Sequence, residues 1–186
     1  SKLKDIHRLS QRMIYVLDVQ SQGMNNVFQE DFLKNSVYKT KEKLDAQYGV
    51  VSILEKDISV QQVALWKIIV LEELMENSYK FRDKDGLRLK LTLTEDAMTF
   101  SDNGVGIPPE EQEKIYEPFY QIYNVFDGNI PGLGLGLTLV KRLVELNRGK
   151  IEVESGSQKG TTIKILFGPS AAQQGSSSPE RSGRKS

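Results

Sequence analysis

The first residues whose types and spacing could do chemistry lie late in a helix predicted from about residue 60 to 81. Glu73 and Asn77 are four residues apart and Lys80 follows one turn later, so the three side chains share one side of that helix. An amide oxygen such as that of Asn77 suits magnesium, which keeps several waters and takes few protein ligands besides phosphates. Taken alone, the same stretch also fits an ordinary solvated helix face.

A second stretch directly follows a predicted strand and contains Asp102, Gly104 and Gly106. A carboxylate at that position can accept a hydrogen bond from an exocyclic amine such as that of adenine. Glycines at this spacing let a planar base approach the backbone, because no Cβ stands in the way. A plain Asp-Asn-Gly turn would use the same residue types, so this stretch alone leaves both interpretations open.

A third stretch has glycine at every second position, Gly132, Gly134 and Gly136, and runs into a helix predicted over 137–146. Backbone amides at a glycine-rich entry to a helix form a site for anions such as phosphates. A flexible hinge is the alternative interpretation of these glycines.

The composition excludes several other kinds of site. The chain has no cysteine, which rules out disulfides and thiolate chemistry, and a single histidine, His7, which leaves little for a zinc site or a catalytic triad. Lys and Arg total 25, as do Asp and Glu, so no net charge points to nucleic acid. No apolar run is long enough to span a membrane and nothing resembles a signal peptide. We expect a cytoplasmic domain that does not bind nucleic acid.

The elements that must position these residues follow from apolar periodicity and turn residues. Helices are predicted over 30–47, 60–81 and 137–146, with Gly49 ending the first and Ser59 capping the second. Strands are predicted over 27–29, 50–54, 87–93, 97–101, 150–154 and 161–167. This order predicts an α/β fold, a two-layer α/β sandwich in which three helices cover one face of a mixed sheet.

The two ends of the chain differ from this central part. Residues 1–22 have apolar side chains at spacings of three and four, which predicts an amphipathic helix before the sandwich. That helix could pack on its own domain or pair with another helix, including one from a second subunit. The segment 169–186 has too few apolar side chains to fold alone, and we expect it to be a disordered tail.

The three chemical stretches, taken together and in order, resemble the N, G1 and G2 boxes of the superfamily of gyrase, chaperone, histidine kinase and mismatch-repair ATPases, which share the Bergerat fold. Between them, residues 117–120 (Glu-Pro-Phe-Tyr) resemble the F box that marks histidine kinases. Residues 160–162 (Gly-Thr-Thr) resemble the closing glycine-threonine element. The resemblance covers residues 25–167, the predicted catalytic ATP-binding domain.

The resemblance implies that the domain binds ATP with Mg²⁺. It implies Asn77 as the magnesium ligand, Lys80 near the phosphates, Asp102 on the adenine amine and residues 103–136 as the ATP lid, with Glu73 and Lys80 as catalytic side chains. The nucleotide-binding residues that it implies are Asn77, Lys80, Phe81, Asp102, Gly104, Gly106, Ile107, Tyr116, Phe119, Gly132, Gly134, Gly136, Leu137, Thr161 and Thr162.

The sequence departs from the family pattern at Glu73, where many histidine kinases have asparagine. Glu73 could act as a general base toward water or orient a water on the metal. Gln121 stands where the family often has arginine, and Lys114 is the one basic residue in the lid segment. Stabilisation of the phosphoryl charge is then left to magnesium, Lys80, Arg82, the helix amides or a partner.

The leading prediction is the catalytic domain of a sensor histidine kinase in two-component signalling. It would transfer the γ-phosphoryl group of ATP to a histidine on a separate phosphoacceptor helix domain, pass signals to a response regulator and dimerise through the helix at 1–22. His7 is expected to be a surface residue, since its neighbours lack the features of a phosphoacceptor box. The alternatives are an ATPase of the same superfamily that uses Glu73 as base, or a degenerate nucleotide-binding module with weak kinase activity.

Overall fold

The computed structural model describes residues 27–83, 86–122 and 132–168. It also describes six separate positions of the N-terminal segment, which are helical with exposed side chains: Leu3, Ile6, His7, Ser10, Gln11 and Ile14. Their conformation agrees with the predicted helix, and His7 is exposed as expected. The predicted helix as a whole and the predicted tail at 169–186 lie outside the described residues.

A five-stranded mixed sheet forms one layer of the molecule, in the order β2-β4-β5-β7-β6. Strand β2 runs parallel to β4, and the other neighbours are antiparallel. The strands of this sheet are β2 (Ile53–Ile58), β4 (Arg88–Leu93), β5 (Ala97–Asp102), β6 (Lys150–Ser155) and β7 (Thr161–Leu166). A separate two-stranded sheet pairs β1 (Val27–Gln29) with β3 (Gln62–Ala64).

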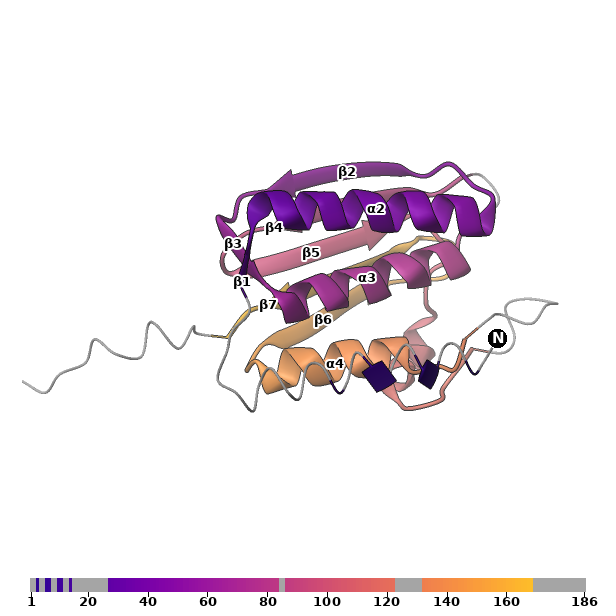
Figure 1. Ribbon diagram of the computed structural model, residues 1–186. Helices are drawn as coiled ribbons and strands as arrows, with labels where there is room; N and C mark the ends of the chain where they lie inside the picture. Colours follow the sequence, from indigo (N-terminus) through magenta and orange to yellow (C-terminus); the bar gives the residue numbers. More distant parts are fainter. Residues whose placement is uncertain are drawn as a thin grey trace, which may run out of the picture.

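Three helices form the second layer and lie on the same face of the large sheet (Figure 1). They are α2 (Glu30–Tyr48), α3 (Leu65–Lys80) and α4 (Gly136–Leu146). Helix α2 ends where Gly49 adopts a left-handed conformation at φ 63° and donates its N–H to the carbonyl of Asp45. The predicted two-layer sandwich with a mixed sheet is confirmed.

Side chains between the two layers form one apolar core. Strand β4 alternates buried and exposed positions, and Leu89, Leu91 and Leu93 have at most 2% of their surface exposed. Helix α3 lies over the middle of the sheet, between α2 and α4, and ten of its residues are buried. Each fully buried aliphatic side chain contributes about 1.5–3 kcal/mol to folding. This burial holds the C-terminal end of α3, which carries Asn77 and Lys80, firmly on the sheet.

The helix predicted over 60–81 was wrong at its start. Residues 62–64 form β3 and pair antiparallel with β1, so α3 begins at Leu65. Ser59 does not cap the helix, because its N–H and hydroxyl donate to the carbonyl of Leu93 beside the end of β2. Tertiary strand pairing therefore decides the conformation of a stretch whose local pattern suits a helix.

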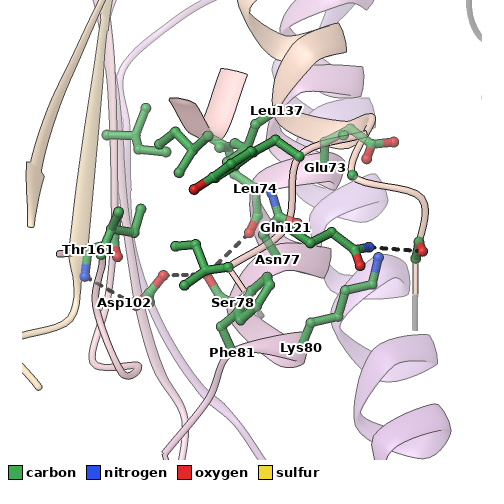
Figure 2. A pocket seen from close by; sticks show the side chains of 18 of the residues that line it. Glu73, Leu74, Asn77, Ser78, Lys80, Phe81, Asp102, Gln121, Leu137 and Thr161 are labelled. Carbon is green, nitrogen blue, oxygen red and sulfur yellow. Dashed lines mark hydrogen bonds between the residues drawn. The ribbon is translucent and has the colours of Figure 1, made fainter. Parts of the chain in front are cut away.

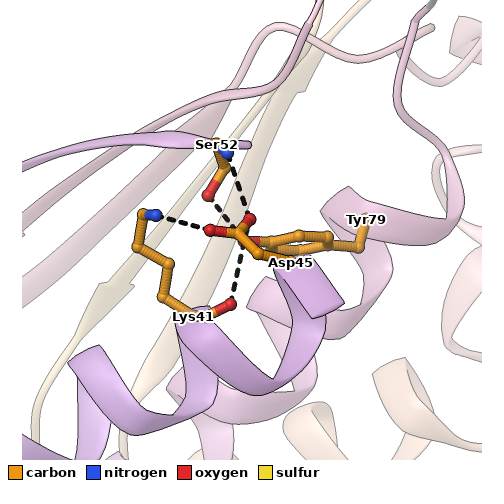
Figure 3. A network of polar contacts seen from close by, with 4 residues as sticks. All are labelled: Lys41, Asp45, Ser52 and Tyr79. Carbon is orange, nitrogen blue, oxygen red and sulfur yellow. Dashed lines mark hydrogen bonds and ion pairs between the residues drawn. The ribbon is translucent and has the colours of Figure 1, made fainter. Parts of the chain in front are cut away.

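The strand predicted over 50–54 was displaced along the chain, since β2 covers Ile53–Ile58. Its register is fixed by parallel pairing with β4, in which Ile53 lies opposite Arg88. Ser52 instead belongs to a polar network with Lys41, Asp45 and Tyr79, drawn in Figure 3.

The predicted lid segment contains two single turns of 3-10 helix, Pro109–Glu111 and Lys114–Tyr116. Residues 123–131 of the lid lie outside the described residues. None of the helices in the described part of the chain is both long enough and apolar enough to cross a membrane.

Candidate functional site

A cavity opens where the end of α3, the end of β5 and the start of α4 meet. It gathers twelve of the residues predicted from the sequence: Glu73, Asn77, Lys80, Phe81, Asp102, Gly106, Ile107, Gly132, Gly134, Gly136, Leu137 and Thr161. Figure 2 shows Asp102 and Thr161 on one side of the cavity, Lys80 and Gln121 on the other, and Asn77 between them. The cavity is therefore polar at both ends, with different chemistry at each.

Asp102 lies at the end of β5, where its carboxylate receives three hydrogen bonds. Oδ1 accepts from the amides of Gly104 (2.9 Å) and Thr161 (3.3 Å), and Oδ2 accepts from the hydroxyl of Ser78 (2.6 Å). Burial raises the pKa of the Asp102 carboxyl, and the hydrogen bonds from Ser78, Gly104 and Thr161 act in the opposite direction. The carboxylate is oriented by fixed donors and is available as an acceptor at the cavity wall.

Glycines around Asp102 allow segments of backbone to lie unusually close together. A Cβ at Gly104 would lie 2.6 Å from the carbonyl oxygen of Phe81, and a Cβ at Gly106 would overlap the carbonyl of Gly156. Gly106 also has a φ of 74°, which disfavours other residues. The start of the predicted lid segment is thus packed against the turn between β6 and β7.

Further hydrogen bonds fix this first part of the lid. The hydroxyl of Ser155 accepts the N–H of Ile107 at 2.8 Å, and the side-chain amide of Gln112 donates to the carbonyl of Ser155 at 2.9 Å. The N–H of Gln158 donates to the carbonyl of Val105 at 2.7 Å. These bonds tie the segment 103–112 to the turn between β6 and β7, and its Gly106 and Ile107 line the cavity.

Asn77 lies in the middle of the cavity, on α3. Its Nδ2 is buried and has no hydrogen-bond partner within the described residues. A Cβ at Gly136 would lie 3.9 Å from both polar atoms of the Asn77 amide and 2.8 Å from Oε2 of Glu73. The first residue of α4 thus faces the amide of Asn77 and the carboxylate of Glu73 across the cavity.

Positive charge at the cavity comes from Lys80. Its Nζ lies 2.9 Å from Oε1 of Glu76, and a Cβ at Gly132 would lie 3.3 Å from the same nitrogen. Within the described ranges, Lys80 is the only basic side chain that lines the cavity. Its ammonium group therefore lies beside the glycine turn that leads into α4.

Two other candidate cations point elsewhere. Arg82 donates to the carbonyls of Tyr79 (2.6 Å) and Tyr48 (3.5 Å), and Lys114 pairs with Glu111 at 3.7 Å. The sequence offers Arg82 as a source of positive charge for the phosphates, but these contacts direct its side chain toward α2.

The two ends of the predicted lid segment are joined beside the cavity. The N–H of Phe119 donates to the carbonyl of Gly134 at 3.0 Å, and the side-chain amide of Gln121 donates to the carbonyl of Gly132 at 3.0 Å. Gln121 thus joins the two lid ends at the position where the family often has arginine. The hydroxyl of Tyr120 forms a short hydrogen bond with Glu111.

Four predicted site residues do not line the cavity: Gly104, Tyr116, Phe119 and Thr162. Phe119 is 67% exposed and has a φ of 66°, while Thr162 donates its hydroxyl to Ser101 at 2.9 Å. Burial raises the pKa of Tyr116 to about 12, and the ammonium of Lys141 lies 5.4 Å from its ring centre. These residues support neighbouring backbone or pack on α4 in this structure.

Several lining residues were missed from the sequence. They include Ser78 and the apolar walls Leu74, Phe100, Ile115, Leu133, Leu135 and Ile163. The apolar residues look like ordinary core positions in their elements. Ser78 did carry a signal, because it is a polar residue next to Asn77 on a helix face that is otherwise apolar.

Comparison with known proteins agrees with this geometry. Residues 65–170 match the profile of the histidine kinase-, DNA gyrase B- and HSP90-like ATPase family, and the chain belongs to that family. Its relatives place it among the histidine kinase ATP-binding domains of this family. Membership implies ATP as the ligand class of the cavity.

Two similar proteins are histidine kinases by name. The chain is 35% identical over 114 residues to a sensor-like histidine kinase of Rhizobium meliloti, a match that covers 60% of this chain. It is 32% identical over 96 residues to the histidine-protein kinase ArlS of Staphylococcus aureus, covering 50% of this chain. Both matches cover 21% of the relative's length, so the chain spans about a fifth of these relatives.

A solved structure has the same fold. The mycobacterial sensor histidine kinase MprB superposes with a TM-score of 0.61 at 21% identity, covering 77% of this chain and 97% of that one.

Proposed function

We propose that this chain is the catalytic domain of a sensor histidine kinase, which binds ATP with magnesium and transfers the γ-phosphoryl group to a histidine. The observation that carries the proposal is the two-ended cavity. An oriented carboxylate, Asp102, lies at one end, and Asn77, Lys80 and the glycine entry to α4 lie at the other. The first end suits the amine of adenine and the second suits a triphosphate.

Magnesium would be held by Asn77 together with phosphate oxygens and water. The described residues contain no group of three His, Cys, Asp or Glu side chains that could hold a metal ion. A site with one amide ligand fits magnesium, because this ion usually relies on phosphates and water for the rest of its coordination. The buried amide nitrogen of Asn77 has a donor to offer a phosphate oxygen at the same place.

The transfer breaks the bond between the γ-phosphorus and the bridging oxygen to the β-phosphate, and forms a bond from phosphorus to a ring nitrogen of the acceptor histidine. ADP leaves with the bridging oxygen. Bound magnesium would neutralise charge on the phosphate oxygens. Lys80 and the amides at the start of α4 supply fixed positive charge from this chain. Since the lid offers little further charge, the acceptor domain is the expected source of any additional cation.

Glu73 has a secondary role in the proposed phosphoryl transfer. Its carboxylate is 3% exposed and lies beside Gly136, so it is placed to orient water on the metal. The resemblance to histidine kinases favours this role over that of a general base in an ATPase.

The partners follow from the reaction. We propose a phosphoacceptor helix domain, a response regulator and a homodimer formed through the helix that includes residues 1–22, in a protein that works in the cytoplasm. Residues 25–167 would form the catalytic domain, and residues 103–136 its lid.

Calorimetric titration with ATP tests the binding site, with and without millimolar magnesium. Asp102→Ala should weaken binding of ATP and of adenosine alike, by about tenfold to a hundredfold, because it removes a charged acceptor. Asn77→Ala should lose the gain in affinity that magnesium confers and leave adenosine binding intact. Asp57→Ala and Asn35→Ala, at exposed positions of β2 and α2, are matched controls that should bind like the parent.

Phosphoryl transfer is read separately, with radiolabelled ATP and the longer protein that carries the acceptor helix. Acid-labile label on histidine is expected. A folded chain that binds no adenine nucleotide would overturn the proposed site, and a longer protein that binds ATP without labelling histidine would overturn the kinase assignment.

A further inference from the structure

Ser78 places a buried hydroxyl group in the cavity. The helix does not need this hydroxyl in order to form. It lies on α3 directly after Asn77 and is 3% exposed. Serine within a helix is less favourable than alanine, because its hydroxyl competes for backbone groups. Its Oγ lies 2.6 Å from Oδ2 of Asp102 and 3.2 Å from the carbonyl of Leu74 (Figure 2). The single proton goes to the carboxylate, since that contact is shorter and the acceptor is charged.

The hydrogen bonds to Asp102 leave a defined acceptor for a ligand. A carboxylate has about four acceptor positions. Two amides, from Gly104 and Thr161, occupy Oδ1, and Ser78 occupies one position on Oδ2. The remaining position on Oδ2 is the one left for a donor in the cavity.

No charged neighbour takes over the role of Ser78. The charged side chains on the elements around Asp102 are Lys67, Glu72, Glu73, Glu76 and Lys80 on α3, Arg88 and Lys90 on β4, and Lys164 on β7. None of them is among the causes that set the pKa of Asp102, which are burial followed by the hydrogen bonds from Ser78, Gly104 and Thr161. The hydroxyl of Ser78 is thus the one side chain that counters the effect of burial.

We propose that Ser78 is a positioning residue that keeps Asp102 an ionised acceptor and thereby selects purine nucleotides with a 6-amino group over those with a 6-keto group. The inference rests on the proposed adenine site. An ionised carboxylate accepts a hydrogen bond from a 6-amino group. It forms none with a 6-keto oxygen, because both groups are acceptors and neither carries a proton. A protonated Asp102 would donate to the keto oxygen instead, so the preference depends on the protonation state that Ser78 maintains.

The test measures binding of ATP and of inosine triphosphate between about pH 5 and pH 8 to the parent, Ser78→Ala and Ser78→Cys. As the pH falls, both variants should begin to lose affinity for ATP at a higher pH than the parent does. Near pH 6 their preference for ATP over inosine triphosphate should be roughly tenfold lower than that of the parent. Cysteine has the same shape as serine with a somewhat larger sulfur, so it leaves no empty space, but it is a weak donor. A loss caused by packing would therefore appear in Ser78→Ala and not in Ser78→Cys.

Ser52→Ala is the matched control, since Ser52 is another buried serine and lies in a polar network outside the cavity. It should leave the pH profile and the preference for ATP unchanged. If the parent binds ATP and either variant gives the parent's pH profile and the parent's preference, the role of Ser78 is wrong while the nucleotide site stands. If the parent binds neither nucleotide, the proposed function itself fails.

Discussion

At the scale of single residues, the clearest stabilising feature outside the cavity is the hydroxyl of Tyr79. This side chain is fully buried, and its hydroxyl lies 2.6 Å from Oδ1 of Asp45 and 2.6 Å from Oγ of Ser52 (Figure 3). Lys41 pairs with the other oxygen of Asp45 at 2.6 Å. Burial alone would raise the pKa of Asp45, but the hydrogen bonds from Lys41, Tyr79 and Ser52 outweigh it and lower that pKa. The network ties α2 to α3.

Removing that hydroxyl with Tyr79→Phe should destabilise the fold by about 1–3 kcal/mol, because the buried hydroxyl of Ser52 loses its partner and Asp45 loses one of its donors. Urea unfolding measures the change. Tyr38→Phe is the matched control, since Tyr38 is 48% exposed and should unfold like the parent. Equal unfolding midpoints for Tyr79→Phe and the parent would show that the network contributes nothing to stability.

At the scale of elements, the glycine entry to α4 is fixed by its contacts with the F-box segment. Gly134 has a φ of 68°, and a Cβ there would lie 2.5 Å from the carbonyl of Tyr120 and 2.8 Å from the carbonyl carbon of Phe119. Its own carbonyl accepts the N–H of Phe119. These contacts indicate that the glycine is needed for close packing as well as for its backbone conformation.

Gly134→Ala should weaken ATP binding by at least about tenfold, because the two lid ends must separate to admit the methyl group. Gly49→Ala is a well-matched control: its φ is 63°, yet a Cβ there meets nothing within 4 Å. Both variants should lose about 1 kcal/mol of stability from the left-handed conformation. Titration calorimetry and thermal melting separate the two effects. Parent-like ATP affinity in Gly134→Ala would mean that the packing of the lid ends does not matter for binding.

At the scale of the whole molecule, the cavity exists because the sheet places distant segments side by side. Asp102 of β5 lies opposite Thr161 of β7, and α3 packs on one face of the same sheet. Burying Asp102 in this arrangement couples folding to pH. As the pH rises, the folded state should become less stable while ATP binding should become stronger.

The pKa of Asp102 is higher in the folded chain than its ordinary value of 3.8, because of burial. The folded state therefore holds the proton more tightly than the unfolded state. The stability that this proton contributes is present below the ordinary pKa and is lost as pH rises through the folded pKa. ATP binding needs the ionised form, so it should strengthen over the same range.

Thermal unfolding of the parent and of Asp102→Asn from about pH 4 to pH 7 measures this. Without nucleotide, the stability of the parent relative to the variant should fall as pH rises. With saturating ATP, the stability of the parent relative to the variant should rise instead. A difference between the two proteins that does not vary with pH would contradict the linkage.

The sequence by itself determined the class of fold, the order of nearly all elements and most of the polar residues in the cavity. Those features depend on local properties: the period of apolar residues, the glycine that ends α2 at Gly49, and polar or glycine residues where strands and helices end. Asn77, Lys80 and Asp102 were identifiable because a phosphate or amine ligand needs such groups at element ends.

The tertiary structure alone decided the rest, because those features depend on pairing between segments far apart in the chain. Pairing with β1 turned residues 62–64 into a strand, and pairing with β4 set the bounds of β2. Other long-range contacts between helices, loops and strands directed Arg82 toward α2 and left Phe119 exposed. They also brought Ser78 against Asp102, since the distance between a hydroxyl on α3 and a carboxylate on β5 is set only when the helix packs on the sheet.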